Sequence, residues 1–207
     1  MSSVGVLLID EGDLPSLVGL ALERAPERVV LWHARGSDDA AQRRLAAVQE
    51  HGQAFSVQRV VVDQGAGAVP GESSSSADAL TQSVRLLSAA AAAIRLNCPR
   101  MVWPVQIGSN SSRICQTVQR ANLVVALAEI GAQKNSLMID VPLIDLGETQ
   151  IVDLAVDQGV LGLAFWPCET GKQDMPCGAC AGCRRWSRGF DGRGQPWQWA
   201  AEAVAAG

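Results

Sequence analysis

The chain has 207 residues, which is enough for one large domain or for one domain with a small appendage. Hydrophobic residues make up 48% of it and charged residues 18%, so a folded core is expected rather than a disordered chain. The net charge of -4 lacks the concentrated positive charge that binding to a phosphate backbone requires. Nucleic acid is therefore not an expected partner.

The apolar residues 4–9 run directly into Asp10 and Glu11 without a basic lead-in, so no secretory signal peptide is expected. The longest apolar stretch, residues 86–94, is too short to cross a bilayer, and no membrane partner is expected. Six cysteines, some with CxxC spacing, then favour metal binding in a reducing compartment over disulfides in a secreted protein. The sequence predicts a cytoplasmic location.

Strand-like and helix-like segments alternate along the chain. In chain order the sequence predicts a strand at residues 4–9, a helix at 17–24, a strand at 28–32, a helix at 38–50, a strand at 57–62, a helix at 78–95, a strand at 101–105, a helix at 112–130, a strand at 137–141 and a helix at about 148–158. Five strands that alternate with helices predict an α/β fold with a doubly wound, mainly parallel five-stranded sheet.

Local signals refine this pattern. Residues 64–77 are rich in glycine and serine and predict a surface loop. Asp145 and Glu148 have the spacing of a capping box, which predicts that Asp145 caps the helix that follows. Gly131 and Gly159 are the predicted stops of the last two helices.

A dense cysteine cluster follows the predicted sheet. Its spacing is C-x8-C-x2-C-x2-C, at Cys168, Cys177, Cys180 and Cys183. Four thiolates form the usual closed shell of a structural zinc. An iron–sulfur cluster is the competing interpretation, but the fourth cysteine that its motif requires is replaced by Ser187. Zinc is favoured over that cluster and over four unligated thiols.

A closed four-cysteine shell leaves no position open for water or substrate, so the zinc is predicted to be structural and to hold a short, loop-rich segment together. Cys98 and Cys115 lie outside the cluster and are interpreted as buried small apolar residues. His33 is interpreted as a structural residue. The sequence assigns no catalytic and no cofactor-binding residue.

A family resemblance is carried by residues 141–154, by Gly159 and Val160, by Trp166-Pro167-Cys168 and by residues 176–190 around the remaining cysteines. Together these residues resemble the C-terminal part of the 7-cyano-7-deazaguanine synthase family. Enzymes of that family use ATP and ammonia to convert a deazaguanine carboxylate into a nitrile in queuosine biosynthesis. The resemblance implies an adenine nucleotide alpha hydrolase-like fold, and it assigns the zinc to the four clustered cysteines.

The resemblance also implies a division of the chain. Residues 1–160 are expected to form a Rossmann-like domain of the PP-loop type, residues 161–190 the zinc-binding segment, and residues 191–207 a C-terminal tail. Trp197 and Trp199 in the tail are interpreted either as an exposed interface or as side chains packed back on the domain.

The N-terminal part departs from the family pattern. Family members carry a Ser-Gly-Gly-x-Asp-Ser loop directly after the first strand, where glycines let backbone N–H groups approach the pyrophosphate. Residues 9–14 occupy that position here, with Asp10 and Glu11 in place of the two glycines and with Asp13 as the one match. At an effective dielectric of about 20, each added charge about 5 Å from a phosphate costs on the order of 3 kcal/mol before screening. We therefore expect most of the affinity for ATP to be lost.

Two further family segments are not recognisable. The Tyr-Gly-Gln segment expected after the second strand is not evident in residues 32–36, and the chain contains no tyrosine. A later acidic substrate-binding segment is not recognisable in residues 108–113.

Three functional hypotheses remain open at this point. The favoured one is a zinc-containing homologue that lacks ATP-dependent catalysis and acts as a binding or partner subunit, with a second copy, an intact paralogue or a small purine-like molecule as its partner. The second is an active ATP-dependent ligase that forms a nitrile or amide from a deazaguanine carboxylate. The third is a structural protein that assembles with itself.

Overall fold

The computed structural model describes residues 5–36, 40–65, 75–132, 137–169 and 175–196. Five parallel strands form one sheet in the order β3-β2-β1-β4-β5. The strands are β1 (Val6–Ile9), β2 (Val29–Ala34), β3 (Arg59–Asp63), β4 (Arg100–Val102) and β5 (Met138–Asp140). The helices are α1 (Leu14–Ala21), α2 (Ala41–Ala54), α3 (Ser75–Arg95), α4 (Ser111–Ala132), α5 (Glu148–Asp157) and α6 (Ala181–Asp191), and the 3-10 helix η1 (Pro26–Arg28) precedes β2.

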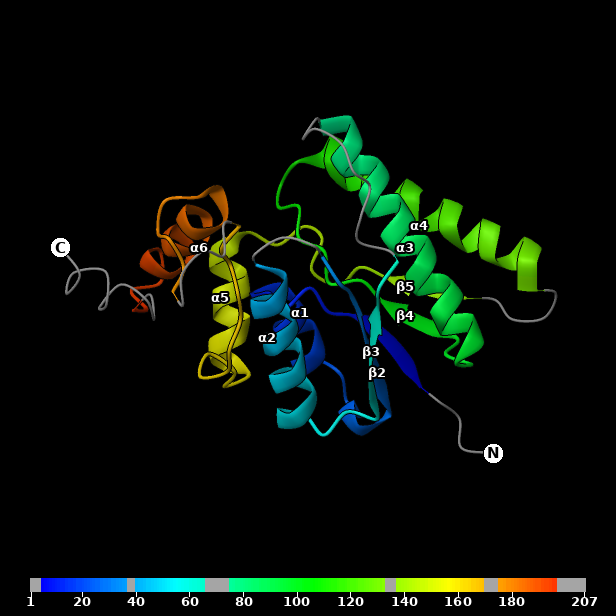
Figure 1. The fold of residues 1–207 in the computed structure, drawn as a ribbon. Coiled ribbons are helices and arrows are strands. Elements are labelled where there is room, and N and C mark those ends of the chain that lie inside the picture. Colours follow the sequence, from blue (N-terminus) through cyan, green and yellow to red (C-terminus); the bar gives the residue numbers. More distant parts are fainter. Residues whose placement is uncertain (1–4, 37–39, 66–74, 133–136, 170–174, 197–207) are drawn as a thin grey trace.

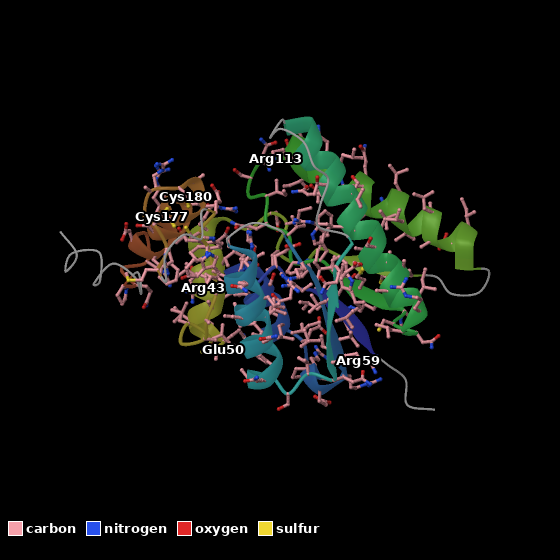
Figure 2. All side chains as sticks on the ribbon, viewed as in Figure 1. Arg43, Glu50, Arg59, Arg113, Cys177 and Cys180 are labelled. Atoms are coloured by element: carbon pink, nitrogen blue, oxygen red, sulfur yellow. The ribbon has the colours of Figure 1, made fainter. Side chains whose placement is uncertain are left out.

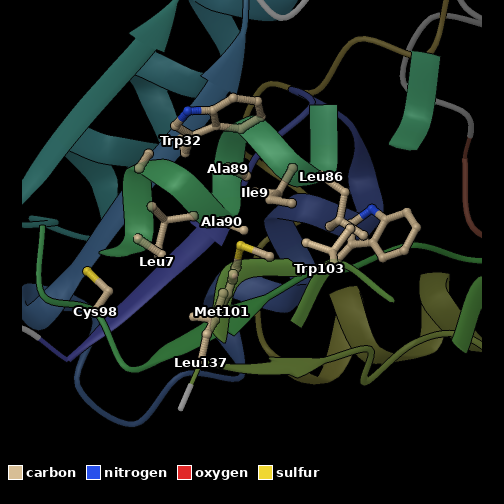
Figure 3. Packing of buried hydrophobic residues seen from close by; sticks show 14 of the residues in the cluster. Leu7, Ile9, Trp32, Leu86, Ala89, Ala90, Cys98, Met101, Trp103 and Leu137 are labelled. Carbon is tan, nitrogen blue, oxygen red and sulfur yellow. The ribbon is translucent and has the colours of Figure 1, made fainter. Parts of the chain in front are cut away.

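Helices cover both faces of the sheet, which confirms the predicted doubly wound α/β fold (Figure 1). Successive residues of β1 point to opposite faces, because side chains alternate along a strand. Leu7 and Ile9 pack with Leu86 and Ala89 of α3, and Figure 3 shows this core from close by. Leu8 belongs to the core on the other face, formed with α1 and α2. A strand that is buried on both faces explains the continuous apolar run in the sequence.

A third buried cluster joins α1 to the C-terminal helices. Leu14 and Leu17 of α1 pack there with Ile151 of α5 and Trp186 of α6. Figure 1 shows α5 and α6 on the side of α1 that faces away from β4 and β5. The helices after the sheet therefore share a core with the first helix of the chain, and this contact brings the cysteine segment toward the loop that follows β1.

The order of strands reverses between β1 and β4. From β1 the chain moves outward to β2 and β3, and it then returns to place β4 on the other side of β1. Open parallel α/β sheets bind ligands in the crevice outside the carboxyl ends of the two strands at such a point. The segments that follow Ile9 and Val102 are therefore where a ligand site is expected.

Three local predictions need correction. Helix α1 begins at Leu14, three residues before its predicted start, because the side chain of Asp13 caps it. Asp145 does not cap α5: the N-cap is Gly147, whose N–H is bound by the side-chain oxygen of Gln150 at 2.8 Å. Helix α3 begins at Ser75, inside the predicted loop 64–77, of which residues 66–74 lie outside the described part of the chain.

Candidate functional site: a cysteine cluster and the loop after the first strand

The four predicted cysteines come together. The Sγ atoms of Cys168, Cys177, Cys180 and Cys183 all lie within 4.8 Å of one another. Cys168 and Cys183 are buried, whereas Cys177 is exposed and Cys180 is intermediate. Figure 2 shows Cys177 and Cys180 at the end of the molecule that carries α6. The cluster can hold a metal ion.

The donor set and its spacing fit a tetrahedral zinc. A Zn–S bond of about 2.3 Å separates neighbouring sulfurs of a tetrahedron by about 3.8 Å, and the Sγ atoms of Cys168 and Cys180 are 4.0 Å apart. Backbone N–H groups also donate to these sulfurs: Cys177 N–H to Cys168 Sγ at 3.4 Å and Cys180 N–H to Cys177 Sγ at 3.3 Å. Such donors stabilise thiolates, the form of cysteine that binds a metal.

Burial raises the pKa of the Cys183 thiol, and its hydrogen bond with Cys180 raises it further. The proton must leave when a cation binds, so the affinity of the cluster for a metal increases with pH.

Helix α6 forms the second half of this segment, which was predicted to be loop-rich. Its N-cap is Cys180, whose Sγ accepts the N–H of Cys183 at 3.4 Å. Gly182 lies in the first turn, and a Cβ there would approach the carbonyl oxygen of Pro167 to 2.2 Å. Glycine is therefore required where the two halves of the segment meet.

The two other cysteines differ from each other. Cys98 is 2% exposed and packs in the core beneath α3, as predicted, and burial raises the pKa of its thiol to about 11. Cys115 lies exposed on α4, so its interpretation as a buried residue was wrong. It falls at a position of α4 that faces solvent, because Thr117 and Ala121 occupy the face toward the core.

In the loop after β1, side chains of nearby residues accept hydrogen bonds from the backbone N–H groups of Glu11 and Gly12. Asp10 is completely buried, and its Oδ1 accepts the N–H of Gly12 at 2.8 Å. The N–H of Glu11 donates to Ser16 Oγ at 3.0 Å. The carbonyl oxygen of Gly12 accepts the N–H of Trp166 at 2.7 Å, which ties the loop to the segment that leads to Cys168.

A side chain also caps the first turn of α1. Pro15 has no N–H, and the N–H of Ser16 donates to Asp13 Oδ1 at 3.0 Å. The hydroxyl of Ser16 donates to the same oxygen at 2.5 Å. Burial raises the pKa of Asp13 in spite of these hydrogen bonds, and the charges of Glu11 and Asp10 raise it further. The N–H of Ser16, which could receive an anion at this helix end, is thus bound by a side chain of the protein itself.

His51 on α2 is the partner of Asp10 and was not identified from the sequence. Its Nδ1 lies 2.9 Å from Asp10 Oδ2, and its Nε2 lies 2.7 Å from the carbonyl oxygen of Ala164. Burial lowers the pKa of His51, but the charge of Asp10 and the hydrogen bonds to Asp10 and Ala164 outweigh that effect and raise it above its ordinary value of 6.5. His33, interpreted from the sequence as structural, is buried, and its Nδ1 lies 2.7 Å from the carbonyl oxygen of Asp10.

A pocket of about 210 Å³ lies beside this loop, at the reversal point of the strand order. Its apolar wall includes Trp103, directly after β4, and Leu86 of α3. Its polar lining residues are Glu11, Asp13, Ser16, Gln82, Arg85, Gln106 and Arg185. Planar and polar surfaces in one cleft suit a small heterocyclic ligand.

Arg185 connects the cysteine segment to the pocket. It lies two residues after Cys183 on α6, and its Nε donates to Glu148 Oε1 at 2.6 Å. Its Nη2 donates to the side-chain oxygen of Gln106. Arg85 enters from α3, and its Nη1 lies 3.6 Å from Glu11 Oε2. These arginines were not predicted as site residues, because they come from α3 and α6, which lie far apart in the sequence, and only the folded chain places both beside one pocket.

Comparison with known proteins matches the C-terminal part of the chain. Residues 114–194 match the family described as Queuosine biosynthesis protein QueC. The 7-cyano-7-deazaguanine synthase of Prochlorococcus marinus (strain MIT 9312) is 39% identical over 54 residues, which cover 26% of this chain and 24% of that protein. The 7-cyano-7-deazaguanine synthase of Methanosarcina barkeri (strain Fusaro / DSM 804) is 38% identical over 61 residues, which cover 30% of this chain and 26% of that protein.

The aligned part of the chain spans about a quarter of the length of these curated relatives. The chain is a homologue of these 7-cyano-7-deazaguanine synthases over part of its length. The residues that match the family, 114–194, include α5, α6 and the four clustered cysteines. The loop after β1 lies outside the match. Within the described residues, no helix combines the length and the apolar character that crossing a membrane requires.

Proposed function

We propose that this chain is a zinc-containing homologue of 7-cyano-7-deazaguanine synthase that has lost ATP-dependent catalysis and acts as a binding or partner subunit. The observation that carries the proposal is the buried carboxylate of Asp10, which binds the N–H of Gly12 inside the loop where the family places its pyrophosphate. An ATP phosphate at this position would compete with a carboxylate already in place and would meet the charges of Glu11 and Asp13.

In this proposal the zinc is structural and is held by Cys168, Cys177, Cys180 and Cys183. When bound, it would cross-link the two halves of the segment and supply no open coordination position. All six cysteines are free of disulfides, in keeping with a reducing, cytoplasmic location.

The pocket beside Trp103 supports the binding role. The pocket is present beside the loop after β1, in which Asp10 binds the backbone. Its lining combines an aromatic side chain with the amides of Gln82 and Gln106. A small purine-like molecule suits such a lining, because a heterocycle can stack on the indole with its edge beside the polar side chains of the pocket. The proposed protein partner is a second copy of the chain or a paralogue with an intact phosphate loop.

Release of pyrophosphate tests the proposal. The zinc-loaded protein is incubated with MgATP, an ammonium salt and 7-carboxy-7-deazaguanine, and pyrophosphate is measured over time. We expect a rate equal to that of a blank without protein, because the triphosphate cannot be seated. Pyrophosphate released in proportion to protein, with formation of the nitrile or the amide, would instead establish the chain as an active ligase.

A further inference from the structure

The ring nitrogens of His51 report its protonation state. Nε2 faces a carbonyl oxygen, which can only accept a hydrogen bond, and Nδ1 faces a carboxylate oxygen. A neutral imidazole carries one N–H and can donate to one of these partners, whereas the imidazolium donates to both. The geometry fits a cationic His51 that donates to the Ala164 carbonyl and to the carboxyl group of Asp10, both side chains being buried.

This ion pair lies in the loop rather than in the pocket. Both side chains are 0% exposed, and neither lines the cleft beside Trp103. The two oxygens of Asp10 are shared between the N–H of Gly12 and the ring of His51. A backbone N–H and a cation that converge on one carboxylate form the donor set that proteins use to bind a small oxyanion.

The surroundings hold this arrangement in place. Gly12 has a φ of +70° and packs against α2 so closely that a Cβ would approach the carbonyl oxygen of Arg44 to 2.5 Å. The N–H of Ala164, whose carbonyl binds His51, donates to Glu50 Oε1 at 2.8 Å. Figure 2 shows Glu50 along the same helix, α2, that carries His51. The loop is therefore clamped between α2 and the segment that leads to Cys168.

We propose that the carboxylate of Asp10 is an internal ligand: it occupies a small-oxyanion site formed by the Gly12 N–H and the His51 imidazolium and so keeps the loop after β1 closed. His51 is a positioning residue in this arrangement, because it acts through Asp10. The inference deepens the proposed loss of nucleotide binding by naming the group that occupies the site.

Removal of the carboxylate is expected to uncover the site. Asp10→Gly leaves the Gly12 N–H and the His51 ring facing a space the size of a carboxylate. We expect sodium formate to raise the thermal unfolding temperature of this variant in a saturable manner, relative to sodium chloride at equal ionic strength, since a ligand that binds only the folded state stabilises it. Inorganic phosphate is tested in parallel, to distinguish a site that fits a carboxylate alone from one that also fits a larger oxyanion.

Asp10→Asn is the matched control, because it keeps the shape of the side chain and still fills the site. The inference predicts at least about a tenfold higher apparent affinity for formate in Asp10→Gly than in Asp10→Asn or the unchanged protein. Equal responses of the two variants, or no response of a folded Asp10→Gly to either anion, would overturn it. ATP binding by the unchanged protein would instead contradict the proposed function, so the two failures are distinguishable.

A second measurement uses the unchanged protein and needs neither of the Asp10 variants. The chain has two histidines, so nitrogen NMR of the side chains can be assigned with a His33→Gln variant. At pH 7 we expect His51 to carry protons on both ring nitrogens, with the Nδ1 signal shifted by the carboxylate. A neutral His51 with a single protonated nitrogen would refute the internal ion pair.

Discussion

Replacement of Cys168 by serine is expected to remove most of the bound zinc and to lower the free energy of unfolding by about 3 kcal/mol or more. Cys168 is 2% exposed and packs against Ala40 and Trp166, so its loss disrupts the buried side of the metal cluster. Metal analysis of the purified protein and denaturant unfolding in the presence of zinc measure the two effects.

Cys115→Ser is the matched control. Cys115 is exposed on α4 and lies outside the cluster, so this variant should keep about one zinc per chain and change stability by no more than about 0.5 kcal/mol. Equal zinc contents in the two variants would contradict the assignment of the metal to the four clustered cysteines. Zinc loss from Cys168→Ser without any loss of stability would contradict the structural role of the metal.

Replacement of His51 by alanine is expected to lower the free energy of unfolding by about 3–5 kcal/mol, because it leaves the buried Asp10 carboxylate without its cation. His33→Ala is the comparison: His33 is equally buried, but its described hydrogen bond is to a backbone oxygen. The decrease in the free energy of unfolding should be smaller for His33→Ala by about 2 kcal/mol, since this variant breaks no ion pair. Equal losses in the two variants would argue against the ion pair.

The stability that His51 contributes should also depend on pH, and its pKa shift sets the direction of that dependence. The folded pKa of His51 is raised above its ordinary value of 6.5, against the effect of burial, by Asp10, by the carbonyl of Ala164 and by Asp13. The stability that this shift contributes is fully present below pH 6.5 and is lost as the pH rises through the folded pKa. The difference in stability between the unchanged protein and His51→Ala should therefore shrink with rising pH. A difference that grows instead would mean that His51 is neutral when folded.

The elements predicted best from the sequence were those with strong local signals. Apolar runs such as residues 4–9 and 28–32 predicted strands that are buried on both faces, and the spacing of the cysteines predicted which side chains meet. The capping of α5 was wrong because Gly147 and Gln150 satisfy the helix start together and leave Asp145 outside it.

Other features depend on contacts that leave no local signal. His51 and Asp10 lie 41 residues apart in the chain, and only the packing of α2 against the loop brings them together. Helix α6 did leave a signal, since Cys183, Trp186 and Phe190 follow one another at helical spacing and are all buried. The density of glycine and cysteine around it favoured a loop instead. Trp197 and Trp199 lie outside the described residues, so their role stays a prediction.

Calorimetric titration of the zinc-loaded protein with MgATP tests the central claim most directly. Because Asp10 occupies the loop and Glu11 and Asp13 add negative charge beside it, we predict no saturable binding at ATP concentrations up to about 1 mM. A dissociation constant in the micromolar range would contradict the claim that the loop after β1 no longer receives a nucleotide.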